Sequence, residues 1–352
     1  MSIATWWFVG ILLTVAAVAW FLVVRRRRIA RWFRRSLAAA AVVLTVLGVA
    51  DAVNAYFAYL PTFGDAFEAA VGQAGRVPFA AVHDTLRPHP HGEVVTFDVP
   101  DRGSGFGASD ALVWLPPQYF SEPDARFPVV YLFHGSPGVP ADWFQGGRAA
   151  EAGLAAARQG EPAIIVAPRM SHGWLDDPEC VDGIHTKVDS HFVLDVVPTV
   201  DSTLRTRADR ADRVLGGMSA GGYCALQLGL THRDLAATVI DMSGLTEPTH
   251  TGGPAALFGD DPAQVERRLA ATSPALYASS LAAAPQTRIW FDVGRGDHET
   301  RGPITAIAPV LRARGFDVGV HLRPGAHTFH VWAPALRAAL PWALAPGAGR
   351  KA

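Results

Sequence analysis

The segment RVLGGMSAGGYCALQLGLT, residues 213–231, passes from an apolar strand-like run through a glycine-rich turn into a helical pattern. Ser219 stands in the turn, with Gly217 and Gly221 two residues away on either side. A serine in such a strand–turn–helix elbow is thrust outward, and glycines flank it because a Cβ there would collide with neighbouring backbone. The segment predicts a nucleophilic serine; the alternative interpretation is a glycine-rich turn without catalysis.

Strand-like and helix-like segments alternate on both sides of this turn. The expected strands begin near residues 94, 111, 128, 162, 213, 236, 287 and 317, and the expected helices span 146–158, 192–206, 220–231, 262–270 and 301–314. Such alternation predicts the α/β class, with a mostly parallel sheet covered by helices on both faces. The central strand-like runs are apolar throughout, as expected for strands buried on two sides.

A serine hydroxyl becomes a strong nucleophile when a histidine accepts its proton and a carboxylate holds that histidine. His327 is the preferred base, because it closes the turn PGAH directly after the last strand-like run, where loops gather at the carboxyl edge of the sheet. His330 follows in an expected helix and is the second choice. His321 lies inside a strand, where a role in the core is expected.

The orienting acid is expected in the turn RGDHE, residues 295–299, which follows the apolar run IWFDVG. Asp297 is preferred, and Glu299 could reach the same space. Asp292 lies within the expected strand and Asp241 ends an earlier one. The resulting order along the chain is serine, acid and histidine, the order that accompanies this type of elbow.

The negative charge that develops on an ester oxygen requires fixed N–H donors. The amide of Ala220, directly after the serine, fills the first position. The segment FHGSPG, residues 133–138, follows an early strand and suggests the Ser136 amide as the second donor, since Pro137 has no N–H. A tight loop without a binding role is the alternative, with His134 only shaping it.

The segments YLFHGSPG, GGMSAGGYCAL, FDVGRGDHE and PGAHTFHVW together resemble the esterase D family of α/β hydrolases. This family includes carboxylesterases, feruloyl esterases, S-formylglutathione hydrolase and the mycolyltransferases. The resemblance covers about residues 97–344 and implies an α/β-hydrolase fold. It implies Ser219, Asp297 and His327 as the catalytic triad and Ser136 and Ala220 as the oxyanion-hole donors, with no cofactor. No feature indicates specificity for glutathione esters.

Two apolar stretches precede this region. Residues 3–24 contain no charge, and residues 36–60 form a second apolar stretch interrupted by Asp51 and Asn54. About 20 apolar residues suffice to cross a bilayer as a helix. Between the two stretches, residues 25–35 contain seven arginines and no acid. This pattern predicts a transmembrane helical hairpin, which is atypical of the soluble members of the family.

The arginine-rich turn also predicts the orientation of the chain. Short loops rich in arginine stay in the cytoplasm, so the catalytic domain is expected on the extracytoplasmic side of the cell membrane. A cleaved signal peptide, the alternative, carries its positive charges before the apolar run and not after it. Without the seven arginines the net charge of −1 would be −8, so no nucleic-acid partner is expected.

The predicted domain organisation therefore has four parts: the hairpin at residues 1–60, a linker at 61–90, the hydrolase domain at 91–346 and a flexible tail at 347–352. No internal repeat interrupts this order.

Two cysteines are present, Cys180 and Cys224. In an oxidising compartment they would form a disulfide between an active-site loop and the helix after Ser219; buried free thiols are the alternative. His89 and His91 have the spacing of metal ligands but no matching second pair, so no metal site is predicted.

The predicted activity is hydrolysis of a small-molecule or lipid ester through an acyl-enzyme intermediate. An acyltransferase acting on lipid or sugar acceptors of the cell envelope would use the same intermediate. A membrane-tethered binding protein with a relic hydrolase fold is the third hypothesis, which retention of all three triad residues disfavours. Trp143, Phe144 and Trp174 suggest an apolar or aromatic substrate group, or packing of a cap.

Overall fold

The computed structural model describes residues 3–25, 30–71, 76–82, 88–173, 176–177, 179–282 and 287–345. Residues 26–29 of the predicted arginine-rich turn, the predicted tail at 347–352 and Trp174 lie outside these ranges. The chain divides into two compact units. The first comprises Met1–Gly75 with Thr328–His330, and the second comprises Arg76–His327 with Val331–Ala352.

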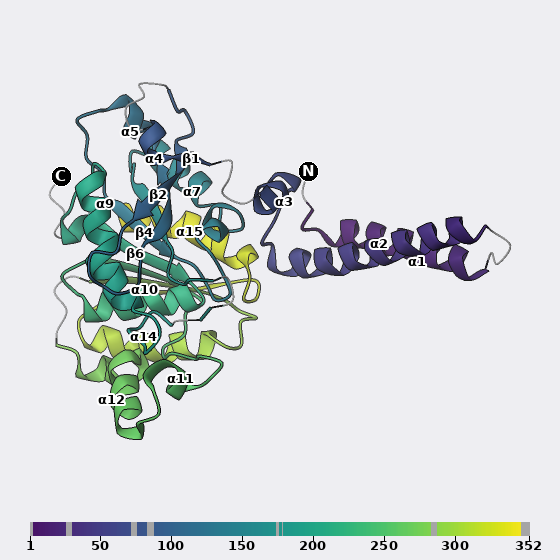
Figure 1. The fold of residues 1–352 in the computed structure, drawn as a ribbon. Coiled ribbons are helices and arrows are strands. Elements are labelled where there is room, and N and C mark those ends of the chain that lie inside the picture. Colours follow the sequence, from purple (N-terminus) through teal and green to yellow (C-terminus); the bar gives the residue numbers. More distant parts are fainter. Residues whose placement is uncertain are drawn as a thin grey trace. The chain divides into compact units, whose positions relative to one another are not determined.

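Two long helices dominate the first unit, α1 (Trp6–Arg25) and α2 (Arg31–Phe57), followed by the short α3 (Phe63–Val71). Both long helices have the length and composition needed to cross a membrane, with mean hydropathies of 2.5 and 2.1. They run side by side (Figure 1). A Cβ on Gly48 would lie 2.6 Å from Leu13 Cδ2, which explains why glycine stands at this close contact.

The second long helix differs from the predicted range 36–60 at both ends. It begins at Arg31, because arginine is a good helix former and does not interrupt the helical pattern. It ends at Phe57, before Leu60, because Asn54 accepts hydrogen bonds from backbone N–H groups that follow the helix. The backbone N–H of Ala58 donates to Asn54 O at 2.6 Å, and the N–H of Leu60 donates to Asn54 Oδ1 at 2.8 Å.

The second unit is built on a nine-stranded sheet. Its strands are β1 (Val77–Pro78), β2 (Glu93–Val99), β3 (Ser109–Leu115), β4 (Val129–Phe133), β5 (Ile164–Pro168), β6 (Arg213–Met218), β7 (Thr238–Met242), β8 (Arg288–Gly294) and β9 (Asp317–Arg323). The eight predicted strands correspond to β2–β9. The short β1, which pairs with β2, lies in the range predicted to be a linker.

The strands are ordered β1-β2-β3-β5-β4-β6-β7-β8-β9. β3 is antiparallel to both neighbours, and from β5 to β9 every pairing is parallel. Every residue of β4, β5, β6 and β7 is buried, which agrees with their unbroken apolar sequences. The prediction of a mostly parallel α/β-hydrolase sheet is confirmed.

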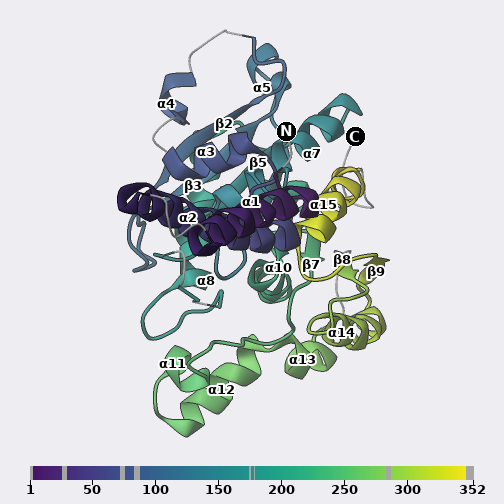
Figure 2. The same cartoon turned by 90° about the vertical axis from the view of Figure 1, so that its right-hand side faces the viewer.

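Helices cover the sheet on both sides: in Figure 2, α7 and α15 lie on one side of the strands and α10 and α14 on the other. The helices and helical turns of this region are α4 (Phe79–Val82), α5 (Pro117–Ser121), α6 (Ala141–Phe144), α7 (Ala149–Arg158), α8 (Val188–Ser190), the π-helix η2 (His191–Val196), α9 (Val197–Thr203), the 3₁₀ turn η3 (Arg210–Asp212), α10 (Ala220–Thr231), α11 (Pro254–Phe258), α12 (Pro262–Thr272), α13 (Pro274–Tyr277), the 3₁₀ turn η4 (Ala278–Ser280), α14 (Arg301–Ala313) and α15 (Phe329–Leu344).

The helix predicted at 192–206 departs most from its expected form. Its first part is the π-helix η2, and only Val197–Thr203 is α-helical, with Pro198 at the start. Proline has no N–H to donate, so it favours the first turn of a helix over its interior. A π-helical turn is rare and often accompanies a functional or tightly constrained site.

Candidate active site

Ser219 occupies a strained turn between β6 and α10. Its φ of 56° and ψ of −126° are rare for a residue with a side chain. The turn is held because the Ser219 N–H donates to Met242 O at 2.9 Å, at the end of the neighbouring strand. A Cβ on Gly217 would lie 1.8 Å from Gly221 O, and one on Gly221 would lie 2.1 Å from Phe133 O. The flanking glycines are therefore required, as the sequence pattern predicted.

The structure brings Ser219, His327 and Asp297 into one hydrogen-bonded chain. His327 Nε2 lies 2.8 Å from Ser219 Oγ, and His327 Nδ1 lies 2.8 Å from Asp297 Oδ2. The side chain of His327 is 30% exposed, whereas that of Asp297 is 1% exposed. With Nδ1 donating to the carboxylate, Nε2 is free to accept the serine proton.

The Asp297 carboxylate is held in its ionised form. Burial by itself would raise its pKa, but hydrogen bonding and charge from His327, together with hydrogen bonds from Thr300, outweigh burial and lower the pKa to about 2. The N–H of Thr300 donates to Asp297 Oδ1 at 3.2 Å. An ionised acid at this position stabilises the positive charge that forms on the imidazole when it accepts a proton.

Backbone contacts hold the acid loop against the histidine loop. The N–H of Arg295 donates to Arg323 O at 2.7 Å, and the N–H of Gly296 donates to Gly325 O at 2.8 Å. A Cβ on Gly294 would lie 2.6 Å from Gly325 O, and Gly325 has a φ of 123° that favours glycine. The close approach of the two loops therefore depends on glycines in both.

The alternative acids and bases are placed elsewhere. Glu299 and His330 are exposed. Asp292 is buried and pairs with Arg323, and His321 stacks on Trp290 with ring centroids 3.5 Å apart. Asp241 accepts a hydrogen bond from the Gly244 N–H at 2.6 Å, and burial raises its pKa to about 7. Within the part of the chain that the structure describes, none of these groups joins the chain of hydrogen bonds at Ser219.

Two backbone amides are available next to Ser219. Ala220 and Ser136 line the same small pocket, and neither N–H donates a hydrogen bond to any described residue. Ala220 N is at the first position of α10, where amide groups point out of the helix end. Unpaired amides at this position can stabilise an oxyanion.

His134 shapes the loop that carries Ser136. Its Nδ1 donates to Gly135 O at 2.9 Å, and its Nε2 accepts a hydrogen bond from the Met170 N–H at 3.2 Å. Burial lowers the pKa of His134 to about 4, so the ring is neutral near pH 7. This neutral ring joins the loop after β4 to the loop after β5, in agreement with the shaping role considered for it.

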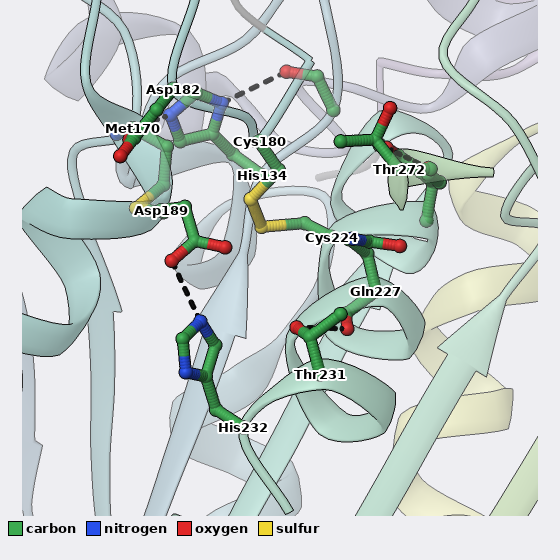
Figure 3. Close-up of a disulfide and its surroundings, with 12 residues drawn as sticks. His134, Met170, Cys180, Asp182, Asp189, Cys224, Gln227, Thr231, His232 and Thr272 are labelled. Carbon is green, nitrogen blue, oxygen red and sulfur yellow. Dashed lines mark hydrogen bonds and ion pairs between the residues drawn. A yellow bond between two sulfur atoms is a disulfide. The ribbon is translucent and has the colours of Figure 1, made fainter. Parts of the chain in front are cut away.

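Cys180 and Cys224 form a disulfide with their Cα atoms 5.2 Å apart. Figure 3 shows the bridge between the loop and α10, close to His134 and Met170. Both cysteines line the pocket that contains Ala220. The bridge thus attaches one wall of the pocket to the helix that follows Ser219.

Three features of this region were not found from the sequence. Trp332 packs edge-on against His327, with ring centroids 4.9 Å apart, and limits the movement of the imidazole. Glu179 is buried in the pocket wall. A second serine–histidine–aspartate chain connects Ser109, His191 and Asp195. The spacing of His191 and Asp195, four residues apart at the start of the expected helix 192–206, was the available signal for the last feature.

Relatives of this chain have been identified in actinobacteria. An uncharacterised protein of Corynebacterium glutamicum is 28% identical over 70% of this chain and 59% of its own length. Esterase Rv1288 of Mycobacterium tuberculosis is 28% identical over 40% of this chain and 30% of its own length. The matched region therefore spans less than two thirds of either relative.

Two solved structures share the fold. A ferulic acid esterase aligns with a TM-score of 0.61 and 24% identity over 72% of this chain and 97% of its own. The S-formylglutathione hydrolase of Agrobacterium tumefaciens aligns with a TM-score of 0.58 and 15% identity over 73% of this chain and 96% of its own. The sequence profile of the Esterase family matches residues 109–343, from β3 to α15. The chain belongs to the Esterase family.

Proposed function

We propose that this member of the Esterase family is a membrane-anchored serine esterase in which Ser219 attacks the substrate. The observation that carries the proposal is the hydrogen-bonded chain from Ser219 through His327 to Asp297, at a strained elbow beside two unpaired amides. These elements supply a nucleophile, a base, an orienting acid and an oxyanion hole.

In the proposed mechanism, Ser219 Oγ attacks the ester carbonyl carbon while its proton passes to His327 Nε2. The carbonyl oxygen gains negative charge and binds to the N–H groups of Ala220 and Ser136. His327 then donates the proton to the departing alcohol, which leaves an acyl group on Ser219. A water molecule, activated by His327, attacks this acyl-enzyme and regenerates the serine.

Hydrolysis is favoured over acyl transfer by the exposure of the site. The His327 side chain is 30% exposed and Ser219 is partly exposed, so water has access to the acyl-enzyme. Transfer to an acceptor requires exclusion of water. Product analysis with an added acceptor alcohol tests this choice: free acid is the expected product, and an ester of the acceptor as the main product would identify an acyltransferase.

The assignment of Ser219 is tested by labelling the full chain, in detergent, with a fluorophosphonate, which reacts with activated serines. The wild type is expected to become labelled at Ser219, and Ser219→Ala is expected to remain unlabelled. A folded wild-type chain that stays unlabelled would contradict the enzymatic proposal and favour the binding-protein hypothesis.

The anchoring part of the proposal rests on α1 and α2. A helix of 20 residues is about 30 Å long, which matches the hydrocarbon core of a bilayer. Only 17% of the apolar window of each helix is buried, unlike a core helix of a soluble protein. Large apolar side chains such as Trp7, Phe21 and Val46 are exposed. A lipid environment would cover this surface.

With the arginine-rich segment in the cytoplasm, both ends of the hairpin lie on the extracytoplasmic side. The catalytic unit is then exported, where a disulfide is stable. Protease added to intact spheroplasts is expected to digest the catalytic unit. A reporter fused after residue 345 gives an independent reading. Protection of the catalytic unit together with cytoplasmic reporter activity would reverse the proposed orientation.

A further inference from the structure

A small pocket adjoins the two amides proposed as the oxyanion hole. It is lined by Phe133, His134, Gly135, Ser136, Met170, Asp176, Asp177, Glu179, Cys180, Ala220, Gly221 and Cys224. It begins next to the nucleophile, because Ala220 follows Ser219 and a Cβ on Gly135 would lie 3.4 Å from Ser219 Cβ. A substituent of an ester bound at Ser219 can therefore enter this pocket.

Glu179 lines the pocket and uses one of its two carboxylate oxygens in hydrogen bonds within the protein. The residue is 5% exposed, and its Oε1 accepts hydrogen bonds from Thr249 N at 2.7 Å and from Thr249 Oγ1 at 3.2 Å. Its Oε2 has no hydrogen-bond partner among the residues that the structure describes. A carboxylate oxygen without a partner, on a residue that lines a pocket, can accept a hydrogen bond from a ligand.

The charges of the pocket wall select the type of donor. Three carboxyl groups line the pocket, those of Asp176, Asp177 and Glu179, and no lysine or arginine is among the described lining residues. His134 is neutral near pH 7, and Arg169, beside Met170, forms an ion pair with Asp110. The described wall is therefore anionic and lacks a positive counter-charge.

The pKa of Glu179 agrees with the absence of a positive charge beside it. Burial, followed by repulsion from Asp177, raises the pKa of Glu179 to about 7, and the hydrogen bonds from Thr249 offset only part of the effect. A cation bound beside the carboxylate would lower the pKa again.

Glu179 and Cys180 also have positive φ values, 53° and 48°, and the disulfide to Cys224 holds this conformation.

The size of the pocket restricts the cation. Its volume is about 20 Å³, and on the same scale one water molecule needs about 10–15 Å³. A primary ammonium is close to water in size, whereas a trimethylammonium group is several times larger. The pocket therefore has room for a primary ammonium.

We propose that this pocket binds a primary ammonium group of the ester substrate and that Glu179 is the residue that recognises it. This inference rests on the proposed function and names its substrate class: esters whose acyl or alcohol part carries an ammonium group. The ammonium donates a hydrogen bond to Glu179 Oε2, and Asp176 and Asp177 add longer-range attraction. Recognition of this kind places the ester carbonyl beside Ser219.

The test compares esters that differ only in this group. Glycine ethyl ester and ethyl propionate exchange an ammonium for a methyl group on the acyl side. The acetates of 4-(aminomethyl)phenol and 4-ethylphenol make the same exchange on the alcohol side. The full chain in detergent is expected to show a kcat/KM about 10- to 100-fold higher for the ammonium ester of one pair. The pair that shows the preference tells whether the acyl or the alcohol part of the substrate carries the ammonium group. Rates measured with Ser219→Ala are subtracted as background.

Three variants assign the preference to the pocket. Glu179→Gln keeps the shape of the side chain and is expected to remove most of the preference for the ammonium ester. Asp177→Asn is expected to reduce the preference about two- to fivefold. Glu266→Gln, which removes an exposed carboxylate of α12, is the matched control and is expected to leave the preference unchanged.

The outcomes separate this inference from the proposed function. Turnover of neutral esters that depends on Ser219, without preference for either ammonium ester, overturns the ammonium pocket alone. An equal loss for both members of a pair in a folded Glu179→Gln variant assigns Glu179 a structural role and also overturns it. Absence of turnover for all four esters, together with absence of fluorophosphonate labelling, overturns both proposals.

Discussion

The second unit contains two serine–histidine–aspartate chains with nearly the same hydrogen-bond geometry. In one, His327 joins Ser219 and Asp297 at 2.8 and 2.8 Å. In the other, His191 joins Ser109 and Asp195 at 3.0 and 2.8 Å. In both, Nε2 faces the serine and Nδ1 faces the acid.

Their surroundings differ at the serine and at the histidine. Ser219 lies in a strained turn at the start of α10, whereas Ser109 is the first residue of β3 and pairs with Val99 in the sheet. The side chains of His191 and Asp195 are fully buried. Phe106 stacks on His191 with ring centroids 4.1 Å apart.

Asp195 also serves several other donors. It accepts hydrogen bonds from the Arg102 N–H at 2.7 Å and from Ser104 Oγ. It therefore attaches the loop before β3 to the π-helix η2. The comparison teaches that hydrogen-bond order alone does not define a catalytic triad: exposure of the imidazole, a turn that projects the serine and adjacent free amides distinguish the two chains.

The largest expected effect is on catalysis. His327→Ala is expected to lower kcat/KM for 4-nitrophenyl acetate by about 10⁴- to 10⁶-fold, because it removes the base of the proposed triad. Steady-state rates of the detergent-solubilised chain measure it. His330→Ala is the control and is expected to retain the wild-type rate within about threefold. Loss of activity in His330→Ala with retention in His327→Ala would exchange their roles.

The next effect is on stability. Asp195→Ala is expected to destabilise the fold by about 3–5 kcal/mol, since it leaves His191, Ser104 and the Arg102 amide without their acceptor. The kcat/KM of the folded fraction is expected to stay within about threefold of the wild type. Thermal unfolding, with exposed Asp260→Ala as the matched control, measures the change. A large loss of kcat/KM without destabilisation would instead indicate a catalytic role.

A smaller effect concerns the pH dependence of stability. The folded-state pKa of Asp297 is depressed from 3.8 to about 2, so its ionised form stabilises the fold at higher pH, and this contribution is lost as the pH falls from about 4 to about 2. Asp297→Asn is expected to be less stable than the wild type by about 1–2 kcal/mol at pH 6, and the gap should narrow towards pH 2.

Urea denaturation at several pH values measures this gap. Asp260→Asn, which changes an exposed carboxyl, serves as the control and should show no such convergence. A constant difference between wild type and Asp297→Asn across the pH range would contradict the low pKa of Asp297.

The smallest effect is expected for Ser109→Ala, which removes one hydrogen bond to His191. The loss of stability is expected to be about 1 kcal/mol, and kcat/KM and fluorophosphonate labelling should remain at wild-type levels. Mass spectrometry of the labelled protein should place the label on Ser219 alone. Label on Ser109 would show that this serine is also reactive and would contradict a purely structural role for the Ser109–His191–Asp195 chain.

Much of the fold was predictable because its signals are local. Eight apolar runs correspond to eight strands, and the glycines around Ser219 indicated the turn that the structure contains. The prediction of an α-helix at 192–206 was only partly correct, because apolar spacing does not distinguish a π-helical turn from an α-helix. The long α15 ends at Leu344, inside the predicted hydrolase domain, and the predicted tail at 347–352 lies outside the described residues.

The amino-acid sequence by itself determined the strand–turn–helix elbow, the order of serine, acid and histidine along the chain, and the two apolar helices, since each depends on residues close together. In the tertiary structure, Asp297 and not Glu299 contacts His327, and His327 and not His330 contacts Ser219. The tertiary structure also places Glu179 in the pocket next to Ala220 and hydrogen-bonds it to Thr249, 70 residues away in the sequence. Such choices depend on strand order and loop packing, and these arise only when distant segments bury their surfaces together.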